Sequence, residues 1–286
     1  MESHSCKAAS SQRTDNSCSL GNAAAFLHVY SLNRIRVTNL LAMTTTRSDE
    51  ASTISTNRAK PWFTFNAVVA WLGLAVSFTL TSTGMYPSTA TDASQIGYAN
   101  ATGAAGALGR IFDWLGYFTI WSNLLVAVVL TLLALNPHRD SLRLRVLRID
   151  TLMMISITGI IYAAIIAPYV TNRGWEHLSN ALVHQITPIL TILVFIIAGP
   201  RGWFNVKAVF AALIVPIVYV IFTLIRGAVI GAYPYSFFNV AKYGYNAVLI
   251  NVIAIAICGL ILAFMFMGID RLMMRRHTNR AQQSNS

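Results

Sequence analysis

The chain has 286 residues, of which 55% are hydrophobic and 11% charged, and its mean hydropathy is +0.56. Soluble domains carry about 25% charged residues, so this composition excludes an ordinary soluble fold, a disordered chain and a nucleic-acid-binding domain. Lys and Arg number 21 against 10 Asp and Glu, giving a net charge of +11. The meaning of that charge depends on where those side chains lie along the chain.

Residues 1–60 differ from the rest of the chain because they are rich in Ser and Thr and carry scattered charge. Their apolar patch, Ala23–Tyr30, is too short to cross a bilayer. Two interpretations stay open: the segment is a disordered cytoplasmic tail, or it precedes a true start at Met43, which opens a short polar lead into the first apolar stretch. We favour the second.

Six long apolar stretches follow. An α-helix needs about 20 apolar residues to cross the hydrocarbon of a bilayer, and each stretch is long enough. The sequence therefore predicts an all-α, polytopic membrane protein with a six-helix transmembrane bundle over residues 61–270 and a basic cytoplasmic tail over residues 271–286. The predicted spans are Trp62–Ser82, Ile111–Leu135, Ile149–Val170, Ser179–Ala198, Ala208–Ile230 and Tyr243–Ile269.

Lys and Arg indicate the orientation of these spans. Six crossings place 17 of the 21 on one side of the membrane and leave four, Arg110, Arg173, Arg226 and Lys242, on the other. Cytoplasmic loops carry the excess of Lys and Arg, so we expect a plasma-membrane protein with both termini in the cytoplasm. The positive charge is then a topology signal, and no nucleic-acid partner is expected.

Polar side chains inside the spans are the clearest functional signal, because they are costly in lipid and usually face the interior of a bundle. They recur at spacings of three and four residues, which puts them on single helix faces. Thr119 lies about 12 Å and His184 about 8 Å into their predicted spans, which predicts a polar cavity open toward the outer leaflet. The residues concerned are Thr119, Ser122, Asn123, Asn180, His184, Thr187, Tyr219, Thr223, Arg226, Asn246 and Asn251.

Each of these residues also has a simpler interpretation. Thr and Ser in membrane helices often bond their own backbone or a neighbouring helix, and Arg226 near a span end can reach the interface. Tyr233 and Tyr235, on either side of Pro234, are typical of an interfacial aromatic belt. Asp113 is expected to be interfacial or paired.

Three short blocks resemble a group of bacterial six-pass membrane proteins that is distantly similar to the androgen-induced and androgen-dependent membrane hydrolases of animals. The blocks are Tyr117–Leu125, Leu182–Pro188 and Arg226–Gly227 with Gly231–Tyr235, and the resemblance covers about residues 62–270. The animal proteins use an intramembrane threonine as nucleophile and a histidine as its partner to cleave esters between fatty acids and hydroxy fatty acids. By motif position, the resemblance implies that Thr119 is the nucleophile and His184 the histidine.

Such chemistry needs a base for the hydroxyl and donors for the oxyanion. His184 supplies the base, and Ser122, Asn123 and Gln185 are the nearest expected donors, with Asn180 and Thr187 as further polar residues of the pocket. No acid is placed to orient His184, because Asp113 lies about 240° around the helix from Thr119. The expected substrate-binding residues are Tyr219, Thr223, Arg226, Asn246 and Asn251.

Two other functions stay open. The same polar residues fit a non-enzymatic transporter or a membrane protein that binds a lipid or small molecule, and they also fit a structural subunit whose polar faces join helices. Membrane lipid or a lipid-like substrate is the expected partner in the first two cases. No cofactor or metal is expected, since Cys6, Cys18 and Cys258 are far apart and no carboxylate or cysteine accompanies the histidines at ligand spacing.

Overall fold

The computed structural model describes residues 58–86, 90 and 92–283. The chain divides into two units, Met1–Ser55 and Thr56–Ser286, and the described residues all belong to the second. The predictions made for the N-terminal segment, a disordered tail or a start at Met43, lie outside the described residues.

The prediction of an all-α bundle with six membrane-spanning helices is confirmed. Six helical segments of the described part of the chain are long and apolar enough to cross a membrane, as in a multi-pass membrane protein. Their bounds are Arg58–Thr83, Phe118–Leu135, Leu142–Tyr169, Glu176–Ala198, Val206–Ile230 and Val240–Arg276.

Several of these spans are made of more than one helical element. The first is one helix, and the second is α3. The third span consists of α4 and two short helical turns, the fourth contains α5 and α6, and the fifth contains α7 and α8. The last span belongs to the long helix α9. This helix is interrupted at Gly244, whose φ of 73° and ψ of 165° are not helical. The bounds are α2 Ala107–Trp114, α3 Phe118–Leu135, α4 Leu142–Ile161, α5 Glu176–Ala181, α6 Thr187–Ala198, α7 Val206–Ala211, α8 Ile214–Ile230 and α9 Val240–Gln283.

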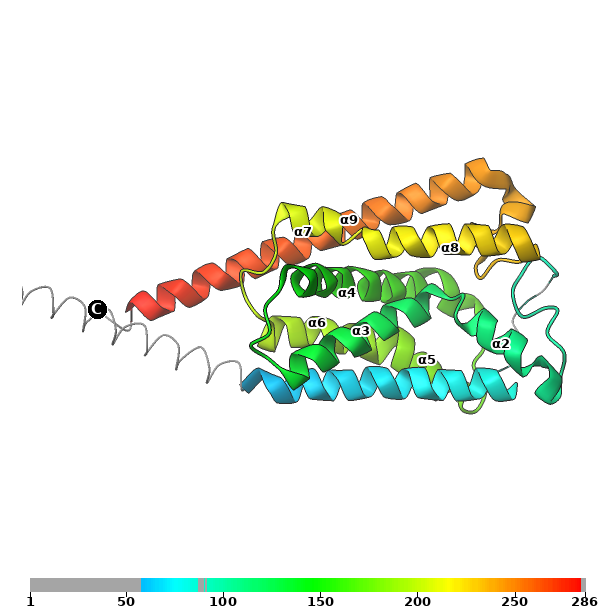
Figure 1. Cartoon of the computed structure of the whole chain (residues 1–286), viewed down its shortest axis with the longest axis horizontal. Helices are drawn as coiled ribbons and strands as arrows, with labels where there is room; N and C mark the ends of the chain where they lie inside the picture. The colour runs from blue at the N-terminus through cyan, green and yellow to red at the C-terminus, as the bar shows by residue number, and fades with distance from the viewer. Residues whose placement is uncertain (1–57, 87–89, 91, 284–286) are drawn as a thin grey trace, which may run out of the picture. The chain divides into compact units, whose positions relative to one another are not determined.

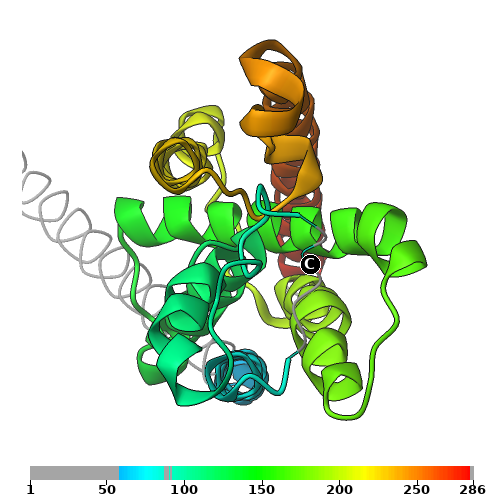
Figure 2. The same ribbon diagram turned by 90° about the vertical axis from the view of Figure 1, so that its right-hand side faces the viewer.

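Helix α4 occupies the centre of the bundle (Figures 1 and 2). It separates the first span, α3 and α5–α6 from α8 and the neighbouring part of α9. Every residue from Arg148 to Thr158 is buried, as expected for a helix that has neighbours on all sides. Helices α8 and α9, by contrast, keep broad apolar faces exposed, including Ile225, Ile250 and Ile261, so these faces are the ones that lipid would cover.

The second span begins later than predicted. We expected one helix from Ile111, but α2 ends at Trp114 and α3 starts at Phe118. Tyr117 between them is extended, with φ −84° and ψ 132°, and the freed Gly116 carbonyl accepts a hydrogen bond from the Tyr219 hydroxyl at 3.0 Å. Thr119 is therefore the second residue of α3, rather than lying two turns inside a longer helix.

Two spans contain a π-helical segment, Tyr162–Ile166 after α4 and Leu182–Ile186 between α5 and α6. Each ends two residues before a proline, Pro168 or Pro188. A proline has no N–H to donate to the carbonyl four residues earlier, so the regular α-helical ladder cannot continue there. Such wide turns occur often at functional sites.

Candidate functional site

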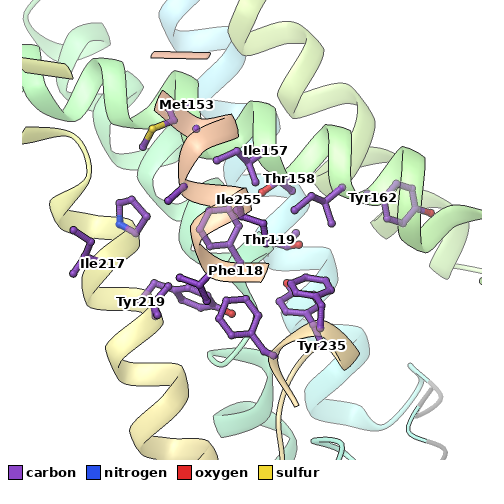
Figure 3. Close-up of a pocket in the computed structure, with 18 of the residues that line it drawn as sticks. Phe118, Thr119, Met153, Ile157, Thr158, Tyr162, Ile217, Tyr219, Tyr235 and Ile255 are labelled. Carbon is purple, nitrogen blue, oxygen red and sulfur yellow. The ribbon is translucent and has the colours of Figure 1, made fainter. Parts of the chain in front are cut away.

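A cavity of about 320 Å³ lies among α3, α4, α8 and α9 (Figure 3). Its lining is almost entirely aliphatic and aromatic, so it differs from the polar cavity that the sequence predicted. Six of the lining residues carry a polar group: Thr119, Thr158, Tyr162, His184, Tyr219 and Tyr235. The apolar lining includes Phe118, Met153, Ile157, Ile161, Ile166, Leu213, Pro216, Ile217, Val220, Ile221, Phe237, Phe238, Val252, Ile255, Ala256 and Gly259.

The two residues that the resemblance implies as catalytic meet in this cavity. Thr119 Oγ1 lies 3.2 Å from His184 Nε2, and Thr119 is 9% exposed. When the hydroxyl donates to Nε2, the neutral imidazole carries its proton on Nδ1. The geometry is that of a hydroxyl and a base within hydrogen-bonding reach.

The imidazole of His184 is oriented by an aromatic ring. Tyr162 stacks on it, with centroids 4.0 Å apart and planes 12° from parallel. Tyr162 and His184 belong to the two π-helical segments. The neighbouring helices approach closely beside them, because a Cβ added at Gly159 of α4 would lie 3.2 Å from Pro188 of α6. Among the described residues, the Nδ1 atom of His184 has no hydrogen-bond partner.

Asn123 and Ser122 hold the backbone around the pair and do not line the cavity. The Asn123 amide nitrogen donates to the carbonyl oxygens of Thr119 at 2.8 Å and of Val183 at 3.0 Å. The Ser122 hydroxyl donates to the Thr119 carbonyl at 3.0 Å and lies 2.8 Å from the Thr158 hydroxyl. Both N–H donors of the Asn123 amide are thus in use. The side chain joins the backbone of Thr119 to that of Val183 and has no donor left for an oxyanion.

Tyr235 is a site residue that the sequence reasoning assigned to an interfacial belt. Its hydroxyl lies near the Thr119 side chain and near the backbone of Phe118 and Thr119 at the start of α3. Burial raises the pKa of Tyr235 above its ordinary value, so the hydroxyl stays protonated and can donate. The one signal in the sequence was its place in the third block of the family resemblance.

Two paired loops hold Tyr235 over the cavity. Tyr233 N donates to the Ser94 carbonyl at 2.9 Å, and Ile96 N donates to the Tyr233 carbonyl at 3.2 Å. The Asn239 amide nitrogen adds a bond of 2.6 Å to the Ser94 hydroxyl. The loop after α8 is therefore fixed at both sides of Tyr235 by the long loop before α2.

The other predicted site residues lie outside the cavity, apart from Tyr219, whose ring is part of the lining. Arg226 forms an ion pair with Asp113 at 2.5 Å, so it neither binds in the cavity nor extends alone to the interface. Thr187 and Thr223 are buried among helices, and Gln185 and Asn246 are exposed away from the site. Asn180 and Asn251 bond to Asn172 and to the Phe237 carbonyl, respectively.

Comparison with protein families, with characterised proteins and with solved structures finds no match for this chain. Within the described residues, no group of three His, Cys, Asp or Glu side chains lies close enough to hold a metal ion. What the site can do therefore has to be argued from its own residues.

Proposed function

We propose that this protein is an intramembrane hydrolase of lipid esters, in which Thr119 is the nucleophile and His184 the base. The observation that carries the proposal is the 3.2 Å contact between Thr119 Oγ1 and His184 Nε2 at the wall of an apolar cavity. A hydroxyl beside an imidazole is the arrangement that nucleophilic catalysis requires, and an apolar cavity suits the hydrocarbon of a fatty-acid ester.

The reaction would run through an acyl-threonine. His184 Nε2 takes the Thr119 proton as Oγ1 attacks the ester carbonyl carbon, and the ester C–O bond then breaks. The leaving alcohol takes the proton from His184, and the acyl group stays on Thr119. Water, deprotonated by the same nitrogen, attacks the acyl-threonine carbonyl, Thr119 regains its proton, and the free acid leaves.

The oxyanion would be stabilised at the start of α3. Thr119 is the second residue of an 18-residue helix, where backbone N–H groups are not used by the helix and the helix dipole favours negative charge. The Tyr235 hydroxyl, close to the same N–H groups, is the side-chain donor that we assign to this role. It replaces Ser122, Asn123 and Gln185 in the hypothesis.

The proposal places the catalytic pair near the outer face of the plasma membrane. Lys and Arg flank the start of the first span, both ends of the α3–α4 joint and the end of the last span, whereas Arg110, Arg173, Arg226 and Lys242 flank the opposite helix ends. This asymmetry supports cytoplasmic termini. Thr119, at the start of α3, then lies on the outer side, where water can enter.

An active-site probe tests the proposal. In lipid nanodiscs, we expect an alkyl fluorophosphonate to label the wild type and Thr119→Ser, but not Thr119→Ala or His184→Gln. Thr131→Ala is the matched control, because Thr131 is also on α3 and its hydroxyl bonds to the Ala127 carbonyl and Trp71, away from the cavity. Labelling that persists in Thr119→Ala, or a folded wild type that is never labelled, contradicts the proposal.

A second function is favoured by the lining of the cavity, which is far more apolar than most hydrolase sites need. A membrane protein that only binds or moves a lipid requires the cavity but not the threonine. Lipid exchange between proteoliposomes that is equally fast in the wild type and Thr119→Ala, without hydrolysis in either, would select this function.

A further inference from the structure

The polar groups of the cavity lie away from Met153. In Figure 3, Tyr235 and Met153 lie at opposite ends of the lining, with Thr119 nearer to Tyr235. From the catalytic end the lining continues along α4 as far as Met153 and along α8 as far as Leu213, and neither of these end residues carries a hydrogen-bonding group. The cavity therefore has one reactive end and one hydrocarbon end.

The cavity extends along α4. Met153 lies nine residues before Tyr162 on α4, which corresponds to about 13 Å of helix. A lining of that length matches a hydrocarbon chain of medium length. The length direction of the cavity follows α4, so a chain in it would lie parallel to the helices.

The side of the cavity is open between α8 and α9. Ile217 and Ile221 belong to the lining and are each 52% exposed, and Ala256 on α9 is both a lining residue and exposed. Both helices have apolar outer faces within predicted membrane spans. A lipid chain can thus pass sideways from the bilayer into the cavity without crossing a polar layer.

The hydrocarbon end is bounded by a glycine of α9. A Cβ added at Gly259 would lie 3.2 Å from Ile157 Cδ1 and 3.3 Å from Met153 Sδ, so any side chain there would occupy the end of the cavity or press on its wall. Glycine is a poor residue for a helix interior, and here its missing side chain allows α9 to pack closely against Ile157 and Met153 of α4 at the end of the cavity.

From these four observations we infer that the cavity binds an acyl chain, which enters between α8 and α9 with its carbonyl at Thr119 and its methyl end at Met153 and Gly259. Gly259 and Met153 then limit the chain length. This inference rests on the proposed hydrolase function only for the position of the ester, since binding of the chain needs no catalysis.

Binding is tested without catalysis by photo-cross-linking. Thr119→Ala in nanodiscs is irradiated with decanoic acid that carries a diazirine near its methyl end, with and without excess decanoic acid. We expect competable cross-links around Met153 and Gly259, and cross-links near Thr119 and Tyr235 when the diazirine is next to the carboxyl group. Cross-links confined to the outer faces of α8 and α9, or the reverse polarity, overturn the inference.

Chain-length selection is tested with para-nitrophenyl esters from butanoate to hexadecanoate. We expect Gly259→Leu to lower kcat/KM for decanoate by about tenfold or more and to lower kcat/KM for butanoate much less, whereas Met153→Ala shifts the preference toward longer chains. Gly268→Leu is the matched control, since it lies on the same helix and a Cβ there meets nothing within 4 Å. If Gly259→Leu fails to fold, the test relies on Met153→Ala. A chain-length profile of Met153→Ala that equals that of the wild type contradicts the inference.

The two proposals fail in different ways. If competable cross-links form at Met153 but no hydrolysis depends on Thr119, the acyl-chain site is supported and the hydrolase function is contradicted. If hydrolysis depends on Thr119 but its chain-length profile is the same in Gly259→Leu, Met153→Ala and the wild type, the hydrolase function is supported. The proposed limit on chain length is then contradicted.

Discussion

The Thr119 hydroxyl faces a base that has no carboxylate behind it. In the described contacts of His184, the ring is held by the stacking of Tyr162 rather than by an acid. A carboxylate buried beside the ring would itself be costly in a membrane bundle. Stacking fixes the ring plane without a buried charge, so the arrangement suits a base that works at membrane depth.

Tyr235 is the residue whose role can be tested most directly. Replacing Tyr235 with Phe keeps the ring in the lining and removes only the hydroxyl that lies beside Thr119 and the first N–H groups of α3. We expect kcat for ester hydrolysis to fall by about a hundredfold, as when one oxyanion donor is lost, with KM changed little. Steady-state kinetics in nanodiscs measure both constants.

Tyr233→Phe serves as its control, because Tyr233 is in the same loop and its ring packs against Gly227 outside the cavity lining. Equal losses of kcat in the two variants would show that the loop, and not the Tyr235 hydroxyl, sets the rate.

At the scale of the elements, the site depends on how α3 meets the π-helical segment Leu182–Ile186. One side chain joins them, because the Asn123 amide binds the carbonyl of Thr119 on one element and that of Val183 on the other. These carbonyls belong to the proposed nucleophile, Thr119, and to the residue before the proposed base, His184. Asn123 is therefore a positioning residue, and its loss should affect the Thr119–His184 distance.

We expect Asn123→Leu to lower the rate of fluorophosphonate labelling per folded molecule by about a hundredfold, since small misplacements of reacting groups have effects of this size. Its loss of buried hydrogen bonds should also lower the free energy of unfolding by about 1–3 kcal/mol. Asn66→Leu removes a comparable buried bond, 3.2 Å long, to Thr191, and should lower stability alone. If the labelling rate falls equally in both variants, the assignment of Asn123 as a positioning residue is contradicted.

Hydropathy was sufficient to locate the spans, and periodicity to bring Thr119, His184 and Tyr219 to one region. It could not locate the break at Tyr117, because the residues around it are as apolar as the helices on either side. Nor could it predict the π-helical segments, which shift the side chains that follow. Arg226 was misassigned because its partner, Asp113, is 113 positions away in sequence, and only the fold brings them together.

Over the whole molecule, burial decreases from α4 outward to α8 and α9. The central helix carries the residues that close the cavity on one side, and the two exposed helices leave its other side open to lipid. A sequence pattern averages over such differences, since all six spans are apolar. The polar interior expected from the sequence is therefore a mostly apolar cavity with one polar end.

The orientation of this bundle decides which leaflet supplies its lipid. With Cys6, Cys18 and Cys258 replaced by Ser, a single cysteine is introduced by Thr102→Cys or by Arg139→Cys, both at exposed positions of opposite joints. We expect a membrane-impermeant maleimide to label Thr102→Cys in intact cells and Arg139→Cys only after permeabilisation, because cytoplasmic joints carry the excess of Lys and Arg. The opposite pattern would place Thr119 and the polar end of the cavity at the inner leaflet, and water and substrate would then have to arrive from the cytoplasm.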